Sequence, residues 1–194
     1  RNYSLDAMGV ATALDQGLTG SGVVVGVIDT GIDIRPDGSS HPEFAGRIDP
    51  RSTTFLHWLS SSVVCHKEDP AECRTFTEAE LEAALQQGPT DSLDQGKHGT
   101  HVSGIIAAGQ NGFGMQGVAP NATIVGVKAV QQGGKVVLDD GTVLSVYGLE
   151  RCGGGDDCDP IGGDKEDTAK AFEYLAQFSD VRVINGSLGP GPGA

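Results

Sequence analysis

Residues 23–28, Val-Val-Val-Gly-Val-Ile, form the stretch that decides the fold expected for this chain of 194 residues. They are almost continuously apolar, which is typical of a strand at the centre of a parallel sheet with both faces covered. A polar turn, Asp29-Thr30-Gly31, follows at once. Binding sites in open α/β sheets assemble at the carboxyl ends of the strands, so Asp29 is a candidate functional residue. The alternative is a turn aspartate that bonds its own backbone.

Strands and helices are expected to alternate along the rest of the chain. Apolar strands are expected at 122–130 and 181–184, and helices at 99–108 and 164–178. This order predicts an α/β fold with a right-handed parallel sheet.

Two local features concern the helices. A further helix is expected from Leu5 to Leu14, capped by Ser4 and ended by Gly17. The helix at 164–178 has apolar residues at helical spacing that should pack on the sheet: Ala169, Phe172, Leu175 and Ala176.

Two segments, at about 49–89 and 131–163, interrupt the alternation and are interpreted as insertions. In the first, Thr77 and Glu80 form a capping box, which predicts a short helix that ends before Gly88. The second begins with a hairpin pattern, in which apolar residues flank an Asp-Gly turn at 140–141.

The charge balance excludes some classes of partner. The chain has 26 acidic and 13 basic residues, a formal net charge of −13. Nucleic acids and anionic membrane surfaces require basic patches, so neither is an expected partner. No run of eighteen apolar residues occurs, so no membrane-spanning helix is expected. The acidic excess is compatible with a secreted protein and with bound cations, but a solvated acidic surface is the simpler explanation.

The four cysteines lie in two pairs that are close in sequence, Cys65 with Cys73 and Cys152 with Cys158. Four cysteines allow three disulfide connectivities, of which local pairing is the simplest. Zinc is the alternative, but neither spacing is the tight Cys-x2-Cys type and only His66 lies beside a pair. We favour local disulfides, which imply an oxidising, extracellular compartment.

The second decisive motif is His-Gly-Thr-His-Val-Ser-Gly at 98–104. A buried Asp29 could hold the Nδ1–H of His98 and stabilise its charged form. His98 and His101 are three residues apart, whereas the zinc-peptidase signature needs a spacing of four and a glutamate. An aspartic peptidase is a further alternative, because these enzymes also carry Asp-Thr-Gly. They need a second, facing carboxylate, and no second Asp-Thr-Gly occurs here.

These motifs resemble those of the subtilisin-like serine peptidases, or subtilases. The strings at 27–33 and 98–104 carry the resemblance, with Gly-Val-Ala-Pro at 117–120 and Asn-Gly-Ser-Leu-Gly at 185–189. The resemblance implies a three-layer, parallel-sheet α/β fold of which residues 1–194 are the N-terminal part of one domain. It also implies hydrolysis of peptide bonds through an acyl-enzyme, with His98 as general base and Asp29 orienting it. His101 would be a packing residue one helical turn on.

The nucleophile of such an enzyme is missing from this sequence. The subtilase order is Asp, His and then Ser, but no Gly-Thr-Ser motif or oxyanion asparagine follows before Ala194. Ser187 is not a candidate, because the Gly-x-Ser-x-Gly elbow would need glycine at Asn185. We expect the serine on the C-terminal part of the same domain, carried by a second chain that partners this one. The alternative is a non-catalytic, subtilase-like module for binding or regulation.

The resemblance implies two binding sites as well. A protein or peptide substrate would lie in extended form along Ser187, Leu188 and Gly189. Calcium, the expected cofactor, would be held by oxygen ligands from the loop at 109–115 and from an acidic residue before it. The expected ligands are Glu43, Gly109, Asn111, Phe113 and Met115. The acidic stretch at 156–167 lacks the full spacing of an EF-hand loop and is interpreted as a solvated loop.

Overall fold

The main sheet has four parallel strands in the order β10-β1-β5-β2. The computed structural model describes residues 3–35, 38–55, 61–66, 69–77, 98–130, 135–137, 143–145, 149–152, 158–160 and 165–188. Strand β1 (Val24–Asp29) lies between β10 (Val181–Gly186) and β5 (Thr123–Lys128), and the short edge strand β2 (Thr53–Thr54) pairs with the other side of β5. The predicted parallel α/β fold is confirmed.

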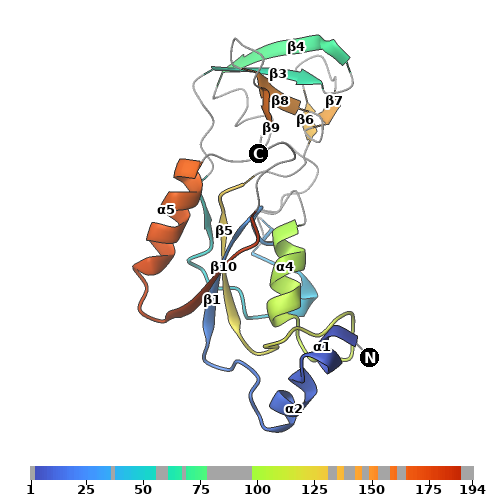
Figure 1. Cartoon of the computed structure of the whole chain (residues 1–194), viewed down its shortest axis with the longest axis vertical. Helices are drawn as coiled ribbons and strands as arrows, with labels where there is room; N and C mark the ends of the chain where they lie inside the picture. Colours follow the sequence, from blue (N-terminus) through green and yellow to red (C-terminus); the bar gives the residue numbers. More distant parts are fainter. Residues whose placement is uncertain are drawn as a thin grey trace.

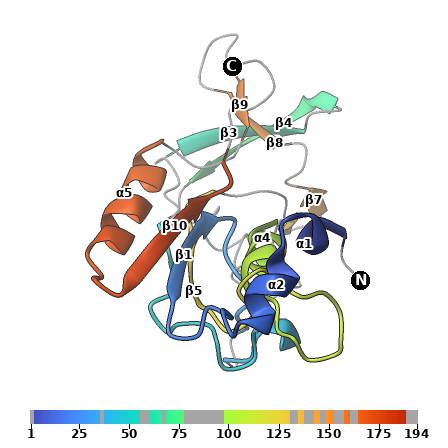
Figure 2. The same cartoon turned by 60° about the horizontal axis from the view of Figure 1, so that its bottom comes forward.

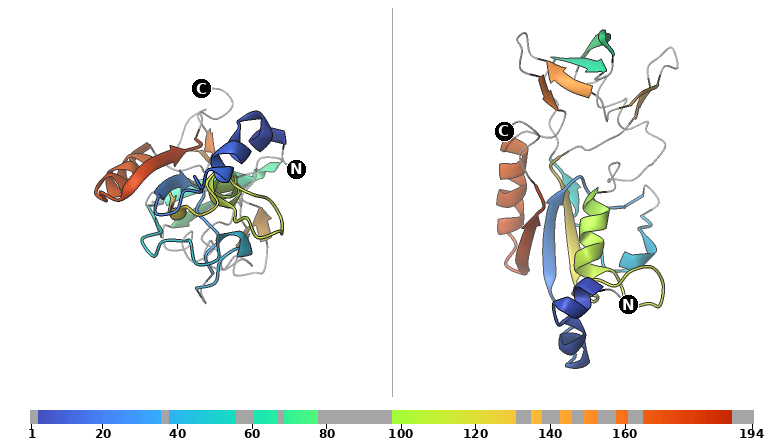
Figure 3. Two further views of the ribbon diagram at one scale, coloured as in Figure 1. Left: turned by 90° about the horizontal axis from the view of Figure 1, so that it is seen from below. Right: turned by 45° about the vertical axis from the view of Figure 1, so that its right-hand side comes forward.

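Helices cover both faces of this sheet (Figures 1 and 3). Helix α4 (His98–Ala107) packs on one face and α5 (Lys165–Ala176) on the other. Both helices lie close to the ranges predicted from the sequence. The short 3-10 helix η1 (Pro42–Phe44) lies on the α4 side, where Phe44 is buried in the core.

Alternation along β1 builds the two cores. Val25 and Val27 belong to the cluster under α4, and Ile28 belongs to the cluster under α5 with Leu175. Gly26 provides the close approach of α5, because a Cβ there would lie 2.6 Å from Leu175 Cδ1. The apolar run therefore serves both faces, as expected for a central parallel strand.

The N-terminal helix differs from the prediction. The expected single helix is two short helices, α1 (Tyr3–Ala7) and α2 (Val10–Asp15). Gly9 separates them in the left-handed conformation, with φ of 72°, which glycine adopts without a steric penalty. Ser4 lies inside α1 and is not its cap, whereas Gly17 does follow the end of the second helix.

The buried face of α5 also differs from the prediction. Leu175 is buried as expected, but Ala169, Phe172 and Ala176 are exposed. Asp167 and Ala171 are buried instead, eight and four residues before Leu175. The helix is therefore rotated relative to the prediction, so that Asp167, Ala171 and Leu175 face the sheet and Phe172 lies toward β10, 42% exposed.

The two predicted insertions contribute to one accessory sheet. Strands β3 (Ser61–His66) and β4 (Asp69–Thr77) come from the first insertion, and β8 (Leu149–Cys152) and β9 (Cys158–Pro160) from the second. They form an antiparallel sheet in the order β4-β3-β8-β9, joined across the insertions by β3 and β8. Figures 1 and 2 show this sheet beyond the end of the parallel core at which α4 and α5 begin.

The smaller predictions for the insertions have mixed outcomes. The hairpin is confirmed, because β6 (Lys135–Val137) pairs antiparallel with β7 (Val143–Ser145). Thr77 is the last residue of strand β4, and the helix that it was expected to cap lies outside the described residues. Among the described residues, no helix is long and apolar enough to cross a membrane.

We predict disulfides Cys65–Cys73 and Cys152–Cys158 from the strand register. Cys65 is the partner of Cys73 in the β3–β4 pair, and Cys152 is the partner of Cys158 in the β8–β9 pair. Directly opposed residues of antiparallel strands have Cα atoms about 4.5–5.5 Å apart, within the range that a disulfide spans. Peptide mapping without reductant should recover both linked pairs. Four free thiols, or links between the two insertions, would contradict the prediction.

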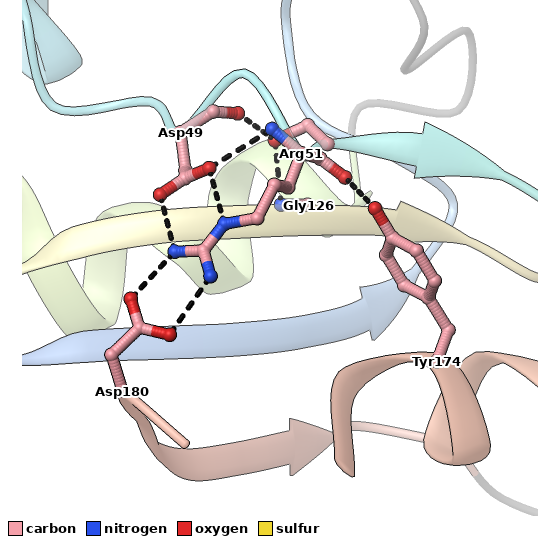
Figure 4. A network of polar contacts seen from close by, with 6 residues as sticks. Asp49, Arg51, Gly126, Tyr174 and Asp180 are labelled. Atoms are coloured by element: carbon pink, nitrogen blue, oxygen red, sulfur yellow. Dashed lines mark hydrogen bonds and ion pairs between the residues drawn. The ribbon is translucent and has the colours of Figure 1, made fainter. Parts of the chain in front are cut away.

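An arginine joins the two edges of the parallel sheet (Figure 4). Arg51, in the turn before β2, makes paired hydrogen bonds of 2.7 and 2.8 Å with Asp49. It makes a second pair, both 2.8 Å, with Asp180 in the turn between α5 and β10. Its guanidinium lies 4.6 Å from the centre of the Phe178 ring, and its carbonyl accepts a bond from Tyr174. These contacts fix the start of β10 to the loop beside β2.

Replacing Arg51 by Met should destabilise the fold at neutral pH and much less in acid. Hydrogen bonds from Arg51 hold the pKa of Asp49 and that of Asp180 below the usual carboxyl range. Such groups contribute stability above their unfolded pKa of about 3.9 and lose it as the pH falls through the lower folded value. The urea midpoint of Arg51→Met should therefore be lower at neutral pH, and the difference should shrink as the pH falls below the unfolded carboxyl pKa.

Arg51→Lys is the matched control for this prediction. Lysine keeps the positive charge but not the planar fork that pairs with two carboxylates. Its urea midpoint at neutral pH should lie between those of the parent protein and Arg51→Met. A difference between parent and Arg51→Met that is the same at every pH would contradict the proposed role of the carboxylates.

Candidate active site

Asp29 and His98 lie in direct contact at the carboxyl end of β1. His98 Nδ1 is 2.7 Å from Asp29 Oδ1, across 69 positions of the sequence. The same carboxylate oxygen accepts the backbone N–H of Thr30, also at 2.7 Å. The contact predicted from the two motifs is therefore present. It orients the imidazole, because a ring nitrogen held by a carboxylate fixes the direction of the other nitrogen.

The two partners differ in exposure. The Asp29 side chain is 0% exposed, whereas that of His98 is 42% exposed. Asp29 Oδ2 has no hydrogen-bond partner in the part of the chain that the structure describes. Since an unpaired buried carboxylate is costly, the imidazole is a principal source of compensation for Asp29. The open side of His98 remains accessible to a reacting group.

Two threonines dock the start of α4 on the end of β1. Thr30 Oγ1 accepts the backbone N–H of Gly99 at 2.9 Å. In the reverse direction, Thr100 Oγ1 accepts the backbone N–H of Asp33 at 2.9 Å. The first bond satisfies an N–H group that the first turn of a helix leaves without an intrahelical partner, and the second satisfies an N–H of the loop that follows β1. They also fix the position of His98, the residue that begins the helix.

Gly99 is required for this close approach. A Cβ at Gly99 would lie 2.0 Å from the backbone oxygen of Gly31 and 3.1 Å from Asp29 Cβ. The first distance is far below any real contact, and a backbone oxygen cannot rotate away. Glycine next to His98 therefore lets the helix start in contact with the turn that follows Asp29.

The strand register brings the expected substrate edge to the same end of the sheet. Ile28 pairs with Gly186, so Asp29 and Ser187 are the next residues on neighbouring strands. Asn185 Nδ2 donates to Ser187 Oγ at 3.1 Å, and Leu188 is 37% exposed. Gly189 lies outside the described residues. The role of these residues in substrate binding stays a prediction.

The expected calcium ligands lie partly together. Glu43 is buried, and its carboxylate accepts bonds from the side chain of Asn111 and from the backbone N–H of Met115. The N–H of Gly109 donates to the Glu43 carbonyl at 3.1 Å, whereas Phe113 is 63% exposed. Among the described residues, no three His, Cys, Asp or Glu side chains are grouped to hold a metal.

Some residues of the site were missed by the sequence analysis, and one was misjudged. The threonine bonds and the packing of Gly99 require knowledge of how α4 meets β1, which no local pattern provides. Thr30, Gly99 and Thr100 do lie within the two motifs. Their small side chains were the one feature of the sequence that could have indicated close packing between α4 and β1. His101, expected to pack, is exposed on α4, because its position on the helix faces away from the sheet.

The family follows from a comparison of the whole sequence. The family model described as the subtilase family matches residues 20–194. The chain belongs to this family. The Asp29–His98 contact therefore occurs between the two subtilase motifs identified in the sequence.

Relatives named as proteases match much of the chain. It is 33% identical over 138 residues to "Extracellular serine protease" of Serratia marcescens, covering 70% of this chain and 10% of that protein. It is 31% identical over 146 residues to "Fervidolysin" of Fervidobacterium pennivorans, covering 75% and 15%. It is 32% identical over 132 residues to "Subtilisin E" of Bacillus subtilis (strain 168), covering 68% and 25%. The subtilase chain thus spans a quarter or less of each of these three relatives.

A solved structure of the Clostridium perfringens CspB protease is also similar. It shares 20% sequence identity with a TM-score of 0.47, over 95% of this chain and 32% of that one.

Gly99→Ala tests the packing at the start of α4. The added methyl would overlap the Gly31 oxygen, so we expect a loss of about 3 kcal/mol in the free energy of unfolding. Gly104→Ala is the matched control on the same helix, since its Cβ would lie at an ordinary 3.5 Å from Met115 Sδ. It should be neutral or stabilise by up to about 1 kcal/mol through helix propensity. Equal effects of the two substitutions in urea unfolding would contradict the steric explanation.

Proposed function

We propose that this chain is the part of a subtilisin-like serine endopeptidase that supplies the aspartate and histidine of the catalytic triad. The observation that carries the proposal is the 2.7 Å contact between buried Asp29 and half-exposed His98. Membership of the subtilase family and relatives named as serine proteases support it. A merely structural ion pair would not need one partner open to solvent at the carboxyl edge of a parallel sheet.

In the proposed reaction, His98 acts as general base and then as general acid. The serine oxygen attacks the carbonyl carbon of the peptide bond while His98 Nε2 accepts the serine proton. Asp29 holds Nδ1–H and stabilises the imidazolium that forms. His98 then gives the proton to the departing amine as the C–N bond breaks, which leaves an acyl-enzyme. Water, deprotonated by the same histidine, hydrolyses the ester and restores the serine.

The serine belongs to the C-terminal part of the same domain, outside these 194 residues. The part of the sequence after Gly104 contains no Gly-Thr-Ser motif. The substrate would pair in extended form with the edge around Ser187, Leu188 and Gly189. Support for this edge comes from its position beside Asp29 and from β10, whose second edge is unpaired among the described strands.

An extracellular location is part of the same proposal. Two relatives from Serratia marcescens are named extracellular serine proteases. The register of both cysteine pairs, which suits disulfides, fits an oxidising compartment. The substrates would then be proteins or peptides outside the cell.

The proposal is tested by substituting each partner in the full-length protein. His98→Ala should lower kcat for a peptide substrate by about a million-fold. Asp29→Asn should lower it by about ten-thousand-fold, because it removes the negative charge and adds an amide donor that can hold His98 in the wrong tautomer. The measurements are steady-state peptide hydrolysis and labelling of the serine by a fluorophosphonate probe.

His101→Ala is the matched control, since it removes an exposed histidine from the same helix. It should retain kcat within about threefold. Residues 1–194 expressed alone should neither hydrolyse peptides nor react with the probe. Full activity of His98→Ala would contradict the proposal. Peptide binding by the full-length protein without hydrolysis or labelling would instead favour a binding or regulatory module.

A further inference from the structure

Arg47 connects three segments at the end of α4 that is remote from His98. Its Nη1 donates to the carbonyl of Ala107, the last residue of α4, at 2.6 Å, and to that of Ala122 at 3.2 Å. Its Nη2 donates to the carbonyl of Glu43. A cation at this position also compensates the partial negative charge at the carboxyl end of a helix. Figure 3 shows η1 and the loop that follows α4 side by side in this region.

Both oxygens of the Glu43 carboxylate accept N–H groups of the neighbouring loop. Its Oε1 accepts the backbone N–H of Met115 at 3.2 Å, and its Oε2 accepts Asn111 Nδ2 at 3.1 Å. The amide oxygen of Asn111 is turned back into the loop, where it accepts the N–H of Phe113 at 2.9 Å. The loop therefore presents nitrogen donors, rather than oxygen ligands, to the buried carboxylate.

Little space remains between Glu43 and this loop. A Cβ at Gly114 would lie 2.1 Å from Glu43 Oε1, and the backbone there has a φ of 60°, which favours glycine. On the other side, a Cβ at Gly109 would lie 3.1 Å from Arg47 Nη2. The carboxylate and the guanidinium thus lie close to the backbone of the loop at Gly114 and at Gly109.

This arrangement does not fit calcium. Calcium takes six to eight oxygen ligands at about 2.3–2.6 Å, whereas the groups that converge on Glu43 are an amide nitrogen and a backbone N–H. Arg47 already uses the Glu43 carbonyl and carries a positive charge next to the same loop. A divalent cation there would be repelled by the guanidinium and would have to displace these bonds.

We propose that the Arg47 guanidinium is the cation of this site, so that the loop at 109–115 and the end of α4 are held without calcium. Arginine suits this role because its planar group donates to several carbonyls at once and stays charged when partly buried. Burial does lower the pKa of Arg47, and the charge of Glu43 opposes that shift. Arg47 is then a positioning residue for α4, the helix that carries His98.

The test compares calcium dependence between variants of the full-length protein, in a His98→Ala background that prevents self-digestion. The thermal midpoint is measured with excess calcium chloride and with EDTA, for the parent, Arg47→Met and Glu43→Gln. Calcium bound elsewhere in the protein would shift all three equally. We expect the calcium-dependent shift to agree within about 1 °C among them, and Arg47→Met to lie about 5 °C or more below the parent in both solutions.

Lys170→Met is the matched control for loss of a cation. Lys170 forms a surface pair with Glu166, 3.3 Å apart and one turn away on α5, so its removal should shift the midpoint by about 1 °C or less. Loss of the calcium-dependent shift in Glu43→Gln would overturn the proposal, because it would place calcium on that carboxylate. An unchanged midpoint in Arg47→Met would overturn it too. Both outcomes are independent of peptidase activity.

Discussion

The contact on which the rest of the site depends is the meeting of α4 with the turn after β1. Gly99 has no side chain at a place where a Cβ would lie 2.0 Å from the Gly31 oxygen. Because no side chain intervenes, the Thr30 and Thr100 hydroxyls can accept backbone N–H groups between the start of α4 and the segment after β1. The result is a helix start fixed closely enough for His98 to reach Asp29, as a 2.7 Å contact between a buried acid and a half-exposed base requires.

The parallel topology explains where the two insertions lie. The first leaves the core after β2 and returns at the start of α4, and the second leaves after β5 and returns at the start of α5. In a parallel sheet, strand ends and the starts of the following helices lie at the same edge. Both insertions therefore emerge beside Asp29 and His98, where β3 and β8 join them into one sheet. The edge that carries Asp29 and His98 and the accessory sheet share one end of the molecule (Figure 1).

Two arginines stabilise the core by different means. Arg51 lies near the surface and pairs with two carboxylates from opposite edges of the sheet, so its contribution depends on their ionisation. The contribution of Arg47 depends less on pH, because Arg47 binds mainly backbone carbonyls, which do not titrate. Its contacts reach the carboxyl end of α4, while the threonine bonds hold the amino end. The helix that carries His98 is thus fixed at both ends.

The sequence by itself determined the class of fold, the family and the pairing of the two motifs that contain Asp29 and His98. The apolar run before Asp29 and the small residues around His98 are local patterns, and strands, helix ranges and the 135–145 hairpin follow from local periodicity and turn chemistry. Only the tertiary structure decided which residues meet across long separations. The rotation of α5, the joining of the insertions and the carbonyls bound by Arg47 depend on crossing angles and register between segments, which local periodicity does not encode. Gly9 is the exception within one segment: helical spacing continues through it, but the left-handed backbone that glycine permits breaks the helix there.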